Sequence, residues 1–147
     1  MLNDDFSKHE SGRPRHFLES LGVKADGEGR LILEVAETHL RSLGLVHGGV
    51  IATLLDSVMG MAAARSSPVE HYLVTAQLNV NFIRPALDGE TLIAFADVRH
   101  VGRRTAVAQG EIRTDSGSLV ATSSATFVYV AHDDRTRGQS ESISTSN

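Results

Sequence analysis

The sequence contains no cysteine. A chain without cysteine can form no disulfide, can hold no metal through thiolate ligands and can use no thiol as a nucleophile. Any catalysis must therefore use other side chains, and we expect no metal centre. The absence of cysteine also fits the reducing cytoplasm, where we expect the protein to reside.

Features of a nucleic-acid-binding protein are missing as well. The formal net charge is −4, no run of lysine and arginine occurs, and only five phenylalanines and two tyrosines could stack on bases. Phosphate backbones bind basic surfaces, so we expect no nucleic-acid partner.

The sequence has no long hydrophobic run. Residues 1–5 contain no basic segment followed by an apolar core, which argues against a signal peptide. The longest apolar stretch, residues 50–64, is interrupted by Thr53, Asp56 and Ser57 and is too short to span a bilayer. We expect a soluble protein without a membrane partner.

What remains is an ordinary globular composition, 41% hydrophobic and 22% charged over 147 residues, which fits a single domain. We expect a flexible N-terminus at residues 1–14 and a folded domain at residues 15–131. Residues 132–147 are polar apart from one isoleucine. Such a composition cannot build a core, so it predicts a disordered tail.

Hydrophobic periodicity predicts one long helix, one short helix and several strands. The long helix is apolar almost all round, which is typical of a buried helix. Short turns between the later strands favour an antiparallel meander, and a curved sheet around one helix is an α+β arrangement. The helices are expected at residues 15–21 and 48–64, and the strands at residues 30–35, 74–82, 91–101, 105–114 and 119–130.

The strand expected at residues 74–82 alternates between apolar and polar residues, which is the pattern of a half-buried strand. Strict alternation puts Thr75 on the polar face. The apolar face would carry Val74, Ala76, Leu78, Val80 and Phe82, and the polar face Thr75, Gln77, Asn79 and Asn81.

Asp56 is the residue that the composition explains least. It lies in the middle of the apolar helix, too far from the helix start to serve as a cap. Burying an ionised carboxylate is costly unless it has a partner. A catalytic carboxylate is one interpretation, and a solvent-facing or hydrogen-bonded structural aspartate is the alternative.

His47, Gly48 and Gly49 precede that helix. Glycine lets the backbone approach a ligand closely, and the first N–H groups of a helix are unsatisfied and partially positive. This arrangement could stabilise the oxyanion formed when a thioester is hydrolysed. The alternative is a tight loop leading into the helix.

The spacing between these candidates has a consequence for assembly. His47 and Asp56 are nine positions apart, or about 13 Å at the rise of an α-helix, and on opposite sides of it. One chain cannot bring both to the same carbonyl. If both are catalytic, the site must be shared across a two-fold dimer.

Residues 44–49 (GLVHGG), followed by Asp56, resemble the signature of the PaaI-type hotdog-fold acyl-CoA thioesterases, a family named for phenylacetic-acid degradation. Residues 79–86 (NVNFIRPA) and the Gly-Glu pair at 89–90 resemble the family's next block. The likeness covers residues 31–130. It implies a hotdog fold, acyl-CoA as substrate, and subunits paired as homodimers that often form homotetramers.

The resemblance also implies roles for single residues. Asp56 corresponds to the family's carboxylate, a general base or a nucleophile, Gly48 to its oxyanion-binding amide, and His47 to its positioning histidine. A hydroxyl that assists water in some relatives falls on Thr75, whose alternative is an ordinary strand threonine. Some relatives carry an asparagine where this chain has Arg41. Arg41 could contact a polar acyl group or the CoA phosphates, or lie on the surface.

CoA phosphates call for basic residues near the substrate. Arg84, Arg103 and Arg104 are candidates because they lie at strand ends and in a turn, and Gly49 is a candidate backbone contact. Solvated turn arginines are the alternative. CoA would be part of the substrate, so no separate cofactor is expected. Aryl, arylacetyl and medium-chain acyl groups all stay open.

Three other classes of function fit the sequence less well. Hotdog hydratases and dehydratases usually carry a histidine soon after an aspartate in the catalytic helix, and none follows Asp56. A non-catalytic acyl-CoA sensor would ordinarily need a DNA-binding segment, for which a short acidic chain has little room. A purely structural module would not need an acid in its most apolar helix.

Overall fold

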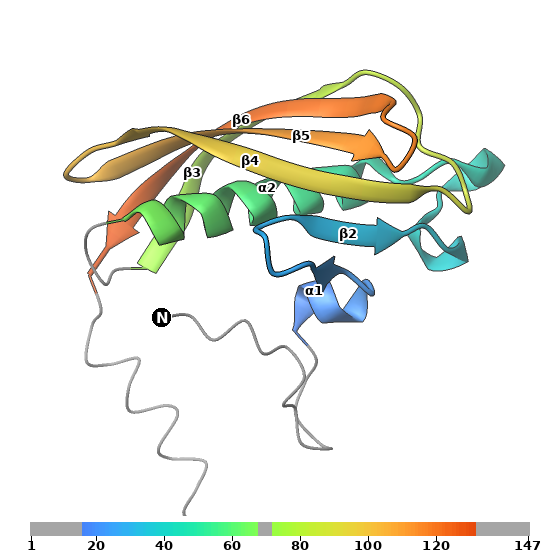
Figure 1. Ribbon diagram of the computed structural model, residues 1–147, viewed down its shortest axis with the longest axis horizontal. Coiled ribbons are helices and arrows are strands. Elements are labelled where there is room, and N and C mark those ends of the chain that lie inside the picture. The colour runs from blue at the N-terminus through green and yellow to red at the C-terminus, as the bar shows by residue number, and fades with distance from the viewer. Residues whose placement is uncertain (1–15, 68–71, 132–147) are drawn as a thin grey trace, which may run out of the picture.

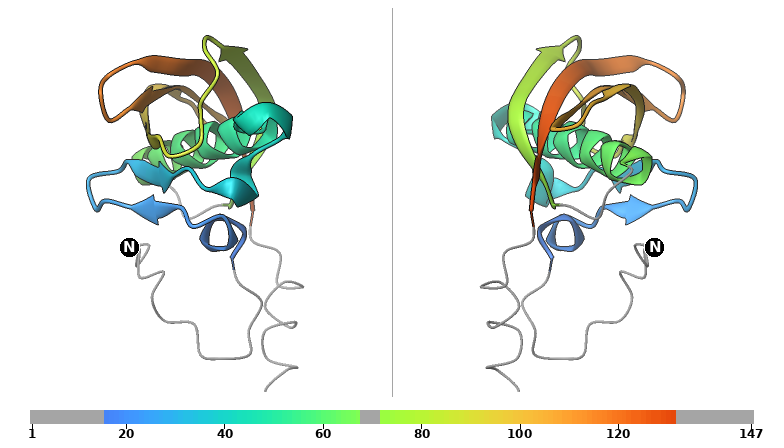
Figure 2. Two further views of the ribbon diagram at one scale, coloured as in Figure 1. Left: turned by 90° about the vertical axis from the view of Figure 1, so that its right-hand side faces the viewer. Right: turned by 90° about the vertical axis from the view of Figure 1, so that its left-hand side faces the viewer.

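A curved six-stranded antiparallel sheet wraps around one long helix in the computed structural model, which describes residues 16–67 and 72–131 (Figures 1 and 2). This is the α+β hotdog arrangement that the sequence predicts. The elements are α1 (Phe17–Ser20), β1 (Lys24–Ala25), β2 (Leu31–Glu34), the 3-10 turns η1 (Glu37–His39) and η2 (Ser42–Gly44), α2 (Gly48–Ser66), β3 (Tyr72–Phe82), β4 (Thr91–Val101), β5 (Thr105–Thr114) and β6 (Leu119–Val130).

Most predicted elements are present, with differences at the N-terminal side. The helix expected at residues 15–21 is a single turn, because Gly22 adopts a positive φ of 74° and ends it. The two-residue strand β1, which pairs with β2, was not predicted. The expectations for residues 1–14 and 132–147 lie outside the described residues.

The strand order is β1-β2-β4-β5-β6-β3, so the predicted meander is right for β4, β5 and β6 and wrong for β3. β3 pairs with β6 and forms an edge of the sheet. The segment between β3 and β4 is hydrogen-bonded to the start of β6. Ile83 N–H and Arg84 N–H both donate to Val120 O, at 2.9 and 3.2 Å. These bonds keep β3 beside β6 instead of letting it fold back on β4.

A β-bulge interrupts β3 at Ala76. Thr75 pairs with Phe127 and Gln77 with Thr126, so Ala76 has no partner on β6. Residues opposite one another share a face of the sheet, and Phe127 is only 2% exposed on the inner face. Thr75 therefore faces inward, and the strict alternation expected from the sequence is wrong at this point because a bulge changes which side chains face the helix.

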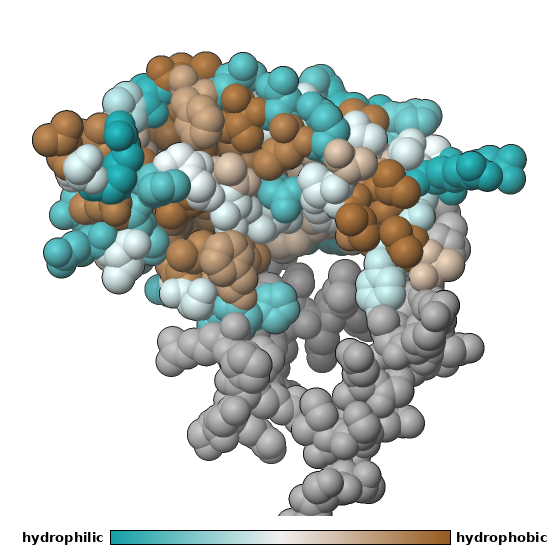
Figure 3. Space-filling view, turned by 180° about the vertical axis from the view of Figure 1, so that it is seen from behind, coloured by the Kyte–Doolittle hydropathy of each residue, from teal (hydrophilic) through white to brown (hydrophobic). Residues whose placement is uncertain are grey.

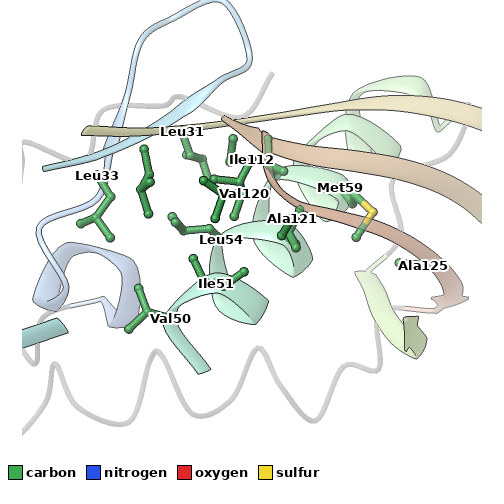
Figure 4. Packing of buried hydrophobic residues seen from close by; sticks show 14 of the residues in the cluster. Leu31, Leu33, Val50, Ile51, Leu54, Met59, Ile112, Val120, Ala121 and Ala125 are labelled. Atoms are coloured by element: carbon green, nitrogen blue, oxygen red, sulfur yellow. The ribbon is translucent and has the colours of Figure 1, made fainter. Parts of the chain in front are cut away.

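The core lies between α2 and the concave face of the sheet (Figure 4). Leu54 and Met59 of α2 are fully buried and share this core with Ile112 and Val120 of the sheet. Gly110 of β5 lets the helix come close, because a Cβ at that position would lie 3.1 Å from Met59 Cγ. Small residues in the sheet thus set how near α2 can approach.

The edge strand β3 exposes large apolar side chains. Val74 and Phe82 on this strand are 51% and 60% exposed, and Ile83 directly after it is 55% exposed. Hydrophobic side chains are also visible on the surface seen from behind (Figure 3). No helix in the described part of the chain has the length and hydropathy needed to cross a membrane.

Candidate functional site

The N-terminus of α2 is capped by a histidine side chain. His47 is the N-cap, and its Nδ1 accepts a hydrogen bond of 2.8 Å from Gly49 N–H. An amide N–H can only donate, so Nδ1 is unprotonated in this geometry. A Cβ on residue 49 would lie 2.9 Å from the same Nδ1, which explains why glycine occupies the position. The Gly49 amide is therefore engaged within the protein.

The neighbouring Gly48 amide is free. It is the first helical residue, and no acceptor for its N–H exists in residues 16–67 and 72–131. The helix N-terminus carries partial positive charge, which strengthens this amide as a donor to a developing negative charge. Of the two glycines, Gly48 rather than Gly49 is equipped to bind an oxyanion.

A cavity of about 300 Å³ lies beside Gly48. Its walls come from the loop before α2, the first turn of α2, the end of β3 and the segment after β3, and most of them are apolar. A small apolar cavity with few polar groups is suited to an acyl chain or an aromatic ring. The lining residues are Arg41, Leu45, Val46, Gly48, Ile51, Phe82, Ile83, Arg84, Pro85 and Ala86.

The two arginines of the cavity differ in their partners. Arg84 forms an ion pair with Glu90, Nη2 to Oε1 at 2.8 Å, and donates from Nη1 to Pro85 O at 2.6 Å. This side-chain hydrogen bond from Arg84 lowers the pKa of Glu90 below its usual value. Arg41 is exposed and has no side-chain hydrogen bond or ion pair within the described residues. Arg41 is thus the uncompensated cation at the cavity.

A second group of polar residues lies further along α2. Thr75 Oγ1 donates a hydrogen bond of 2.7 Å to Asp56 Oδ1, from β3 to the half-buried aspartate of the helix. Neither residue lines the cavity beside Gly48. Gly48 and Asp56 are eight positions apart in one helix, or about 12 Å. Within one chain, the Gly48 amide and the Asp56 carboxylate therefore belong to two separate groups of residues.

The remaining candidates lie apart from both groups. Arg103 and Arg104 are exposed in the turn between β4 and β5, at the end of the molecule opposite the N-terminus of α2 (Figure 1). Within the ranges that the structure describes, no cluster of three or more histidine, aspartate or glutamate side chains could hold a metal ion.

Sequence reasoning missed two residues near the cavity. Glu90 holds Arg84, and it also accepts a hydrogen bond of 2.9 Å from Leu87 N–H. His39 is a buried residue at the end of η1, immediately before the loop that leads to α2. The Gly-Glu pair at 89–90 was part of the second motif, but nothing local to the sequence indicates that its glutamate bonds to Arg84.

Sequence comparisons show that this chain is similar to thioesterases. Residues 43–121 match the family model described as "Thioesterase superfamily". The chain is 32% identical over 110 residues to acyl-coenzyme A thioesterase 13 of Mus musculus, an alignment that covers 71% of this chain and 76% of the mouse protein. The human protein of the same name is 30% identical over 118 residues, covering 74% and 81%.

Solved structures agree with the sequence matches. A Bacillus halodurans protein crystallised with CoA has a TM-score of 0.71 at 31% identity, over 77% of this chain and 74% of that one. The PaaI protein of the Escherichia coli phenylacetic acid degradation operon has a TM-score of 0.69 at 26% identity, over 78% and 83%. Both the sequence and the backbone of this chain are therefore similar to those of these proteins.

Proposed function

Since this chain belongs to the thioesterase superfamily and is a thioester hydrolase of the hotdog fold, we propose that it cleaves acyl-CoA to a free acid and CoA. The mouse relative is named an acyl-coenzyme A thioesterase, and the Bacillus halodurans relative was crystallised with CoA. The observation that carries the proposal for this chain is the bond between Thr75 and Asp56. It orients a carboxylate in the middle of a helix that is apolar over most of its surface.

The proposed chemistry uses two groups of the protein, the Gly48 amide and the Asp56 carboxylate. The thioester carbonyl oxygen accepts a hydrogen bond from Gly48 N–H, which stabilises the negative charge of the tetrahedral intermediate. As general base, Asp56 takes a proton from water while the water oxygen bonds to the carbonyl carbon. The C–S bond then breaks, and the proton passes to the thiolate of CoA. As nucleophile, Asp56 would itself form the bond to carbon and the C–S bond would break, so that CoA leaves as a thiolate. Water would then open the resulting anhydride, which releases the acid and supplies the proton that the thiolate takes up.

We further propose that the site is shared between two subunits, with Gly48 from one and Asp56 from the other. The separation of about 12 Å along α2 supports this, because one thioester carbonyl cannot reach both groups in one chain. The exposed apolar residues of β3, an edge strand, favour pairing with a second copy. A homotetramer built from two such dimers stays a prediction.

The substrate contacts follow from the cavity. Its apolar walls suit an aryl, arylacetyl or medium-chain acyl group. Arg41 is the proposed polar contact, because its charge has no partner among the described residues, whereas Glu90 already neutralises Arg84. In a shared site, CoA phosphate contacts from Arg103 and Arg104 would come from the second subunit, since both lie far from Gly48 in their own chain.

The decisive experiment measures release of free thiol from a panel of acyl-CoA esters by the wild type and by Asp56→Asn. Asparagine keeps the shape of the side chain and an oxygen that can accept from Thr75, so the fold should persist. We expect turnover to fall by about 100-fold or more. Equal rates would remove Asp56 from the mechanism. Tight binding of the esters without turnover by the wild type would indicate an acyl-CoA sensor.

A single-turnover reaction in ¹⁸O-labelled water separates the two roles of Asp56. Label in the Asp56 carboxylate indicates a nucleophile, because the anhydride is opened by water at the protein side. Label only in the released acid excludes an anhydride opened at the Asp56 carbon, which is the result expected of a general base.

A further inference from the structure

His39 is a buried titratable residue that the proposed mechanism does not use. Its side chain is 4% exposed, and it bonds at both ring nitrogens. Nδ1 accepts from Ala36 N–H at 2.9 Å, and Nε2 lies 2.6 Å from Leu21 O. A carbonyl can only accept, so Nε2 carries the proton and the ring is neutral. The imidazole thus joins the end of α1 to the loop that precedes α2.

The main chain of His39 extends this connection to the N-terminus of α2. Its carbonyl accepts a hydrogen bond of 2.9 Å from His47 N–H. The loop between the two histidines is closed by a further bond, from Arg41 N–H to Leu45 O at 2.8 Å. The bond from His47 N–H to His39 O therefore holds the two ends of this loop together.

A continuous set of hydrogen bonds results. Leu21 O accepts from the ring of His39, the carbonyl of His39 accepts from His47 N–H, and Nδ1 of His47 accepts from Gly49 N–H. Gly48 lies between the last two bonded residues, and its own N–H is the free donor at the cavity. The direction of Gly48 N–H depends on the orientation of the neighbouring peptide planes. Hydrogen bonds of His39 and His47 hold these planes in place.

We propose that His39 is a positioning residue for the reaction, which acts through His47 on the direction of the Gly48 amide. The inference rests on the proposed role of that amide. Hydrogen bonding to a developing oxyanion is directional, so a small rotation of the donor lowers the rate. Contacts to an apolar acyl chain are not directional, so the same rotation should change substrate binding much less.

The other buried polar residues in the described chain offer a comparison. Thr114 and Ser123 are 3% and 6% exposed, and their hydroxyls bond within the sheet and its turn. Neither is connected to the α2 N-terminus by such a path. If His39 were merely a structural residue, replacing Thr114 and replacing His39 should have the same kind of effect.

The test compares His39→Phe, His39→Asn and His39→Gln with Thr114→Val as the matched control. Phenylalanine keeps a ring and removes both hydrogen bonds. Asparagine can still accept from Ala36 N–H, and glutamine can still donate to Leu21 O. For each variant, kcat and KM for acyl-CoA are measured well below its midpoint of thermal unfolding.

We expect His39→Phe to lower kcat by about 10- to 100-fold and to change KM by less than about 3-fold. The Asn and Gln variants should each recover part of kcat, and Thr114→Val should keep the wild-type kcat. If His39→Phe does not fold, the same split between kcat and KM must appear in the other two variants. Wild-type kcat in a folded His39 variant, or an equal loss in Thr114→Val, would overturn the inference.

Asp56→Asn in the same assay separates this inference from the proposed function. An inactive Asp56 variant together with fully active His39 variants refutes the positioning role alone. An active Asp56 variant refutes the proposed mechanism, whatever the His39 variants do.

Discussion

Thr75 Oγ1 donates a hydrogen bond to Asp56 Oδ1 over 2.7 Å, which joins the edge strand β3 to the middle of α2. Hydrogen bonds to ionised groups are stronger than neutral ones, so this bond should fix the orientation of the carboxylate. We expect Thr75→Val, which keeps the shape but removes the hydroxyl, to lower kcat by about 10-fold or more. Thr75→Ser should keep most of it. Wild-type kcat for Thr75→Val in the thiol-release assay would contradict the role.

The bulge at Ala76 gives a second prediction. Deleting Ala76 should remove the bulge and leave Thr75 opposite Phe127 and Gln77 opposite Thr126, so that Thr75 still faces inward in register with Leu78. We therefore expect this deletion to lower kcat much less than Thr75→Val, which removes the hydroxyl itself.

Deletion of Arg99 is the matched control for the bulge, because the pairing of β4 also shifts between Val98 and His100, near the turn to β5 and away from Asp56. This variant should keep its activity. The prediction fails if the Ala76 deletion, folded by circular dichroism, loses as much kcat as Thr75→Val while the Arg99 deletion keeps it.

The Gly48 amide can be removed almost without other change. Proline is tolerated at the first position of a helix, and His47 has the extended backbone (ψ 133°) that must precede it. We therefore expect Gly48→Pro to fold and to lose about 100-fold in kcat, as when an oxyanion donor is removed.

Mixing Gly48→Pro with Asp56→Asn tests whether the site is shared. In a mixed dimer one of the two sites would combine an intact Gly48 with an intact Asp56. After the subunits are co-expressed or refolded together, we expect about a quarter of the wild-type activity from two inactive variants. No recovery, with mixed dimers demonstrated by mass spectrometry, would indicate sites formed within single chains.

The cap at His47 makes a prediction about stability. His47→Ala removes the acceptor for Gly49 N–H, and loss of an N-cap costs about 1 kcal/mol of unfolding free energy. His47→Asn supplies another acceptor and should restore both the stability and most of kcat. Restored stability with an inactive enzyme would mean that the imidazole itself contacts the substrate.

Alanine substitutions of Gly48 and Gly49 provide the control for this prediction about stability. Gly49→Ala should behave like His47→Ala, because its Cβ would displace the imidazole. At Gly48, a Cβ would lie 3.4 Å from Phe82 Cε1, an ordinary contact, so Gly48→Ala should keep the wild-type unfolding temperature.

The ion pair between Arg84 and Glu90 predicts a pH dependence of stability. Hydrogen bonding from Arg84 lowers the pKa of Glu90 from 4.5, so folding favours the charged carboxylate. This contribution is fully present above the pKa of the unfolded chain and is lost as the pH falls through the lower pKa of the folded protein. Denaturant unfolding of Glu90→Gln should therefore show a smaller loss of stability below pH 4.5 than the wild type. At neutral pH the variant should lose up to about 1 kcal/mol.

A double-mutant cycle with Arg84→Gln checks the cause. If Arg84 lowers the pKa of Glu90, then Arg84→Gln should remove most of the same acid dependence, and the double variant should add little. Additive effects would show that the two side chains act independently.

Local patterns explain most of what the sequence predicted correctly. The long apolar run gave α2, and alternation between short turns gave β4, β5 and β6. Asp56 stood out because a carboxylate in an apolar helix contradicts its surroundings. These features depend on neighbours within a few residues, which the sequence displays directly.

Features that depend on distant contacts could not be predicted. The position of β3 beside β6 requires hydrogen bonds to Val120, and the inward direction of Thr75 requires the bulge at Ala76. The family resemblance points to Thr75 as a site residue, whereas the apolar–polar alternation of the strand puts Thr75 on the opposite face of the sheet. The pairing of Arg84 with Glu90 arises from a loop conformation that no periodicity indicates.

The spacing of Gly48 and Asp56 along one helix also bears on how the enzyme responds to its own concentration. If catalysis needs one group from each of two chains, a lone subunit is inactive even when fully folded. Specific activity should then fall on dilution, with a midpoint set by the dissociation constant of the dimer, and acyl-CoA bound between the subunits should shift that midpoint to lower protein concentration. The abundance of the chain would thus regulate turnover by mass action.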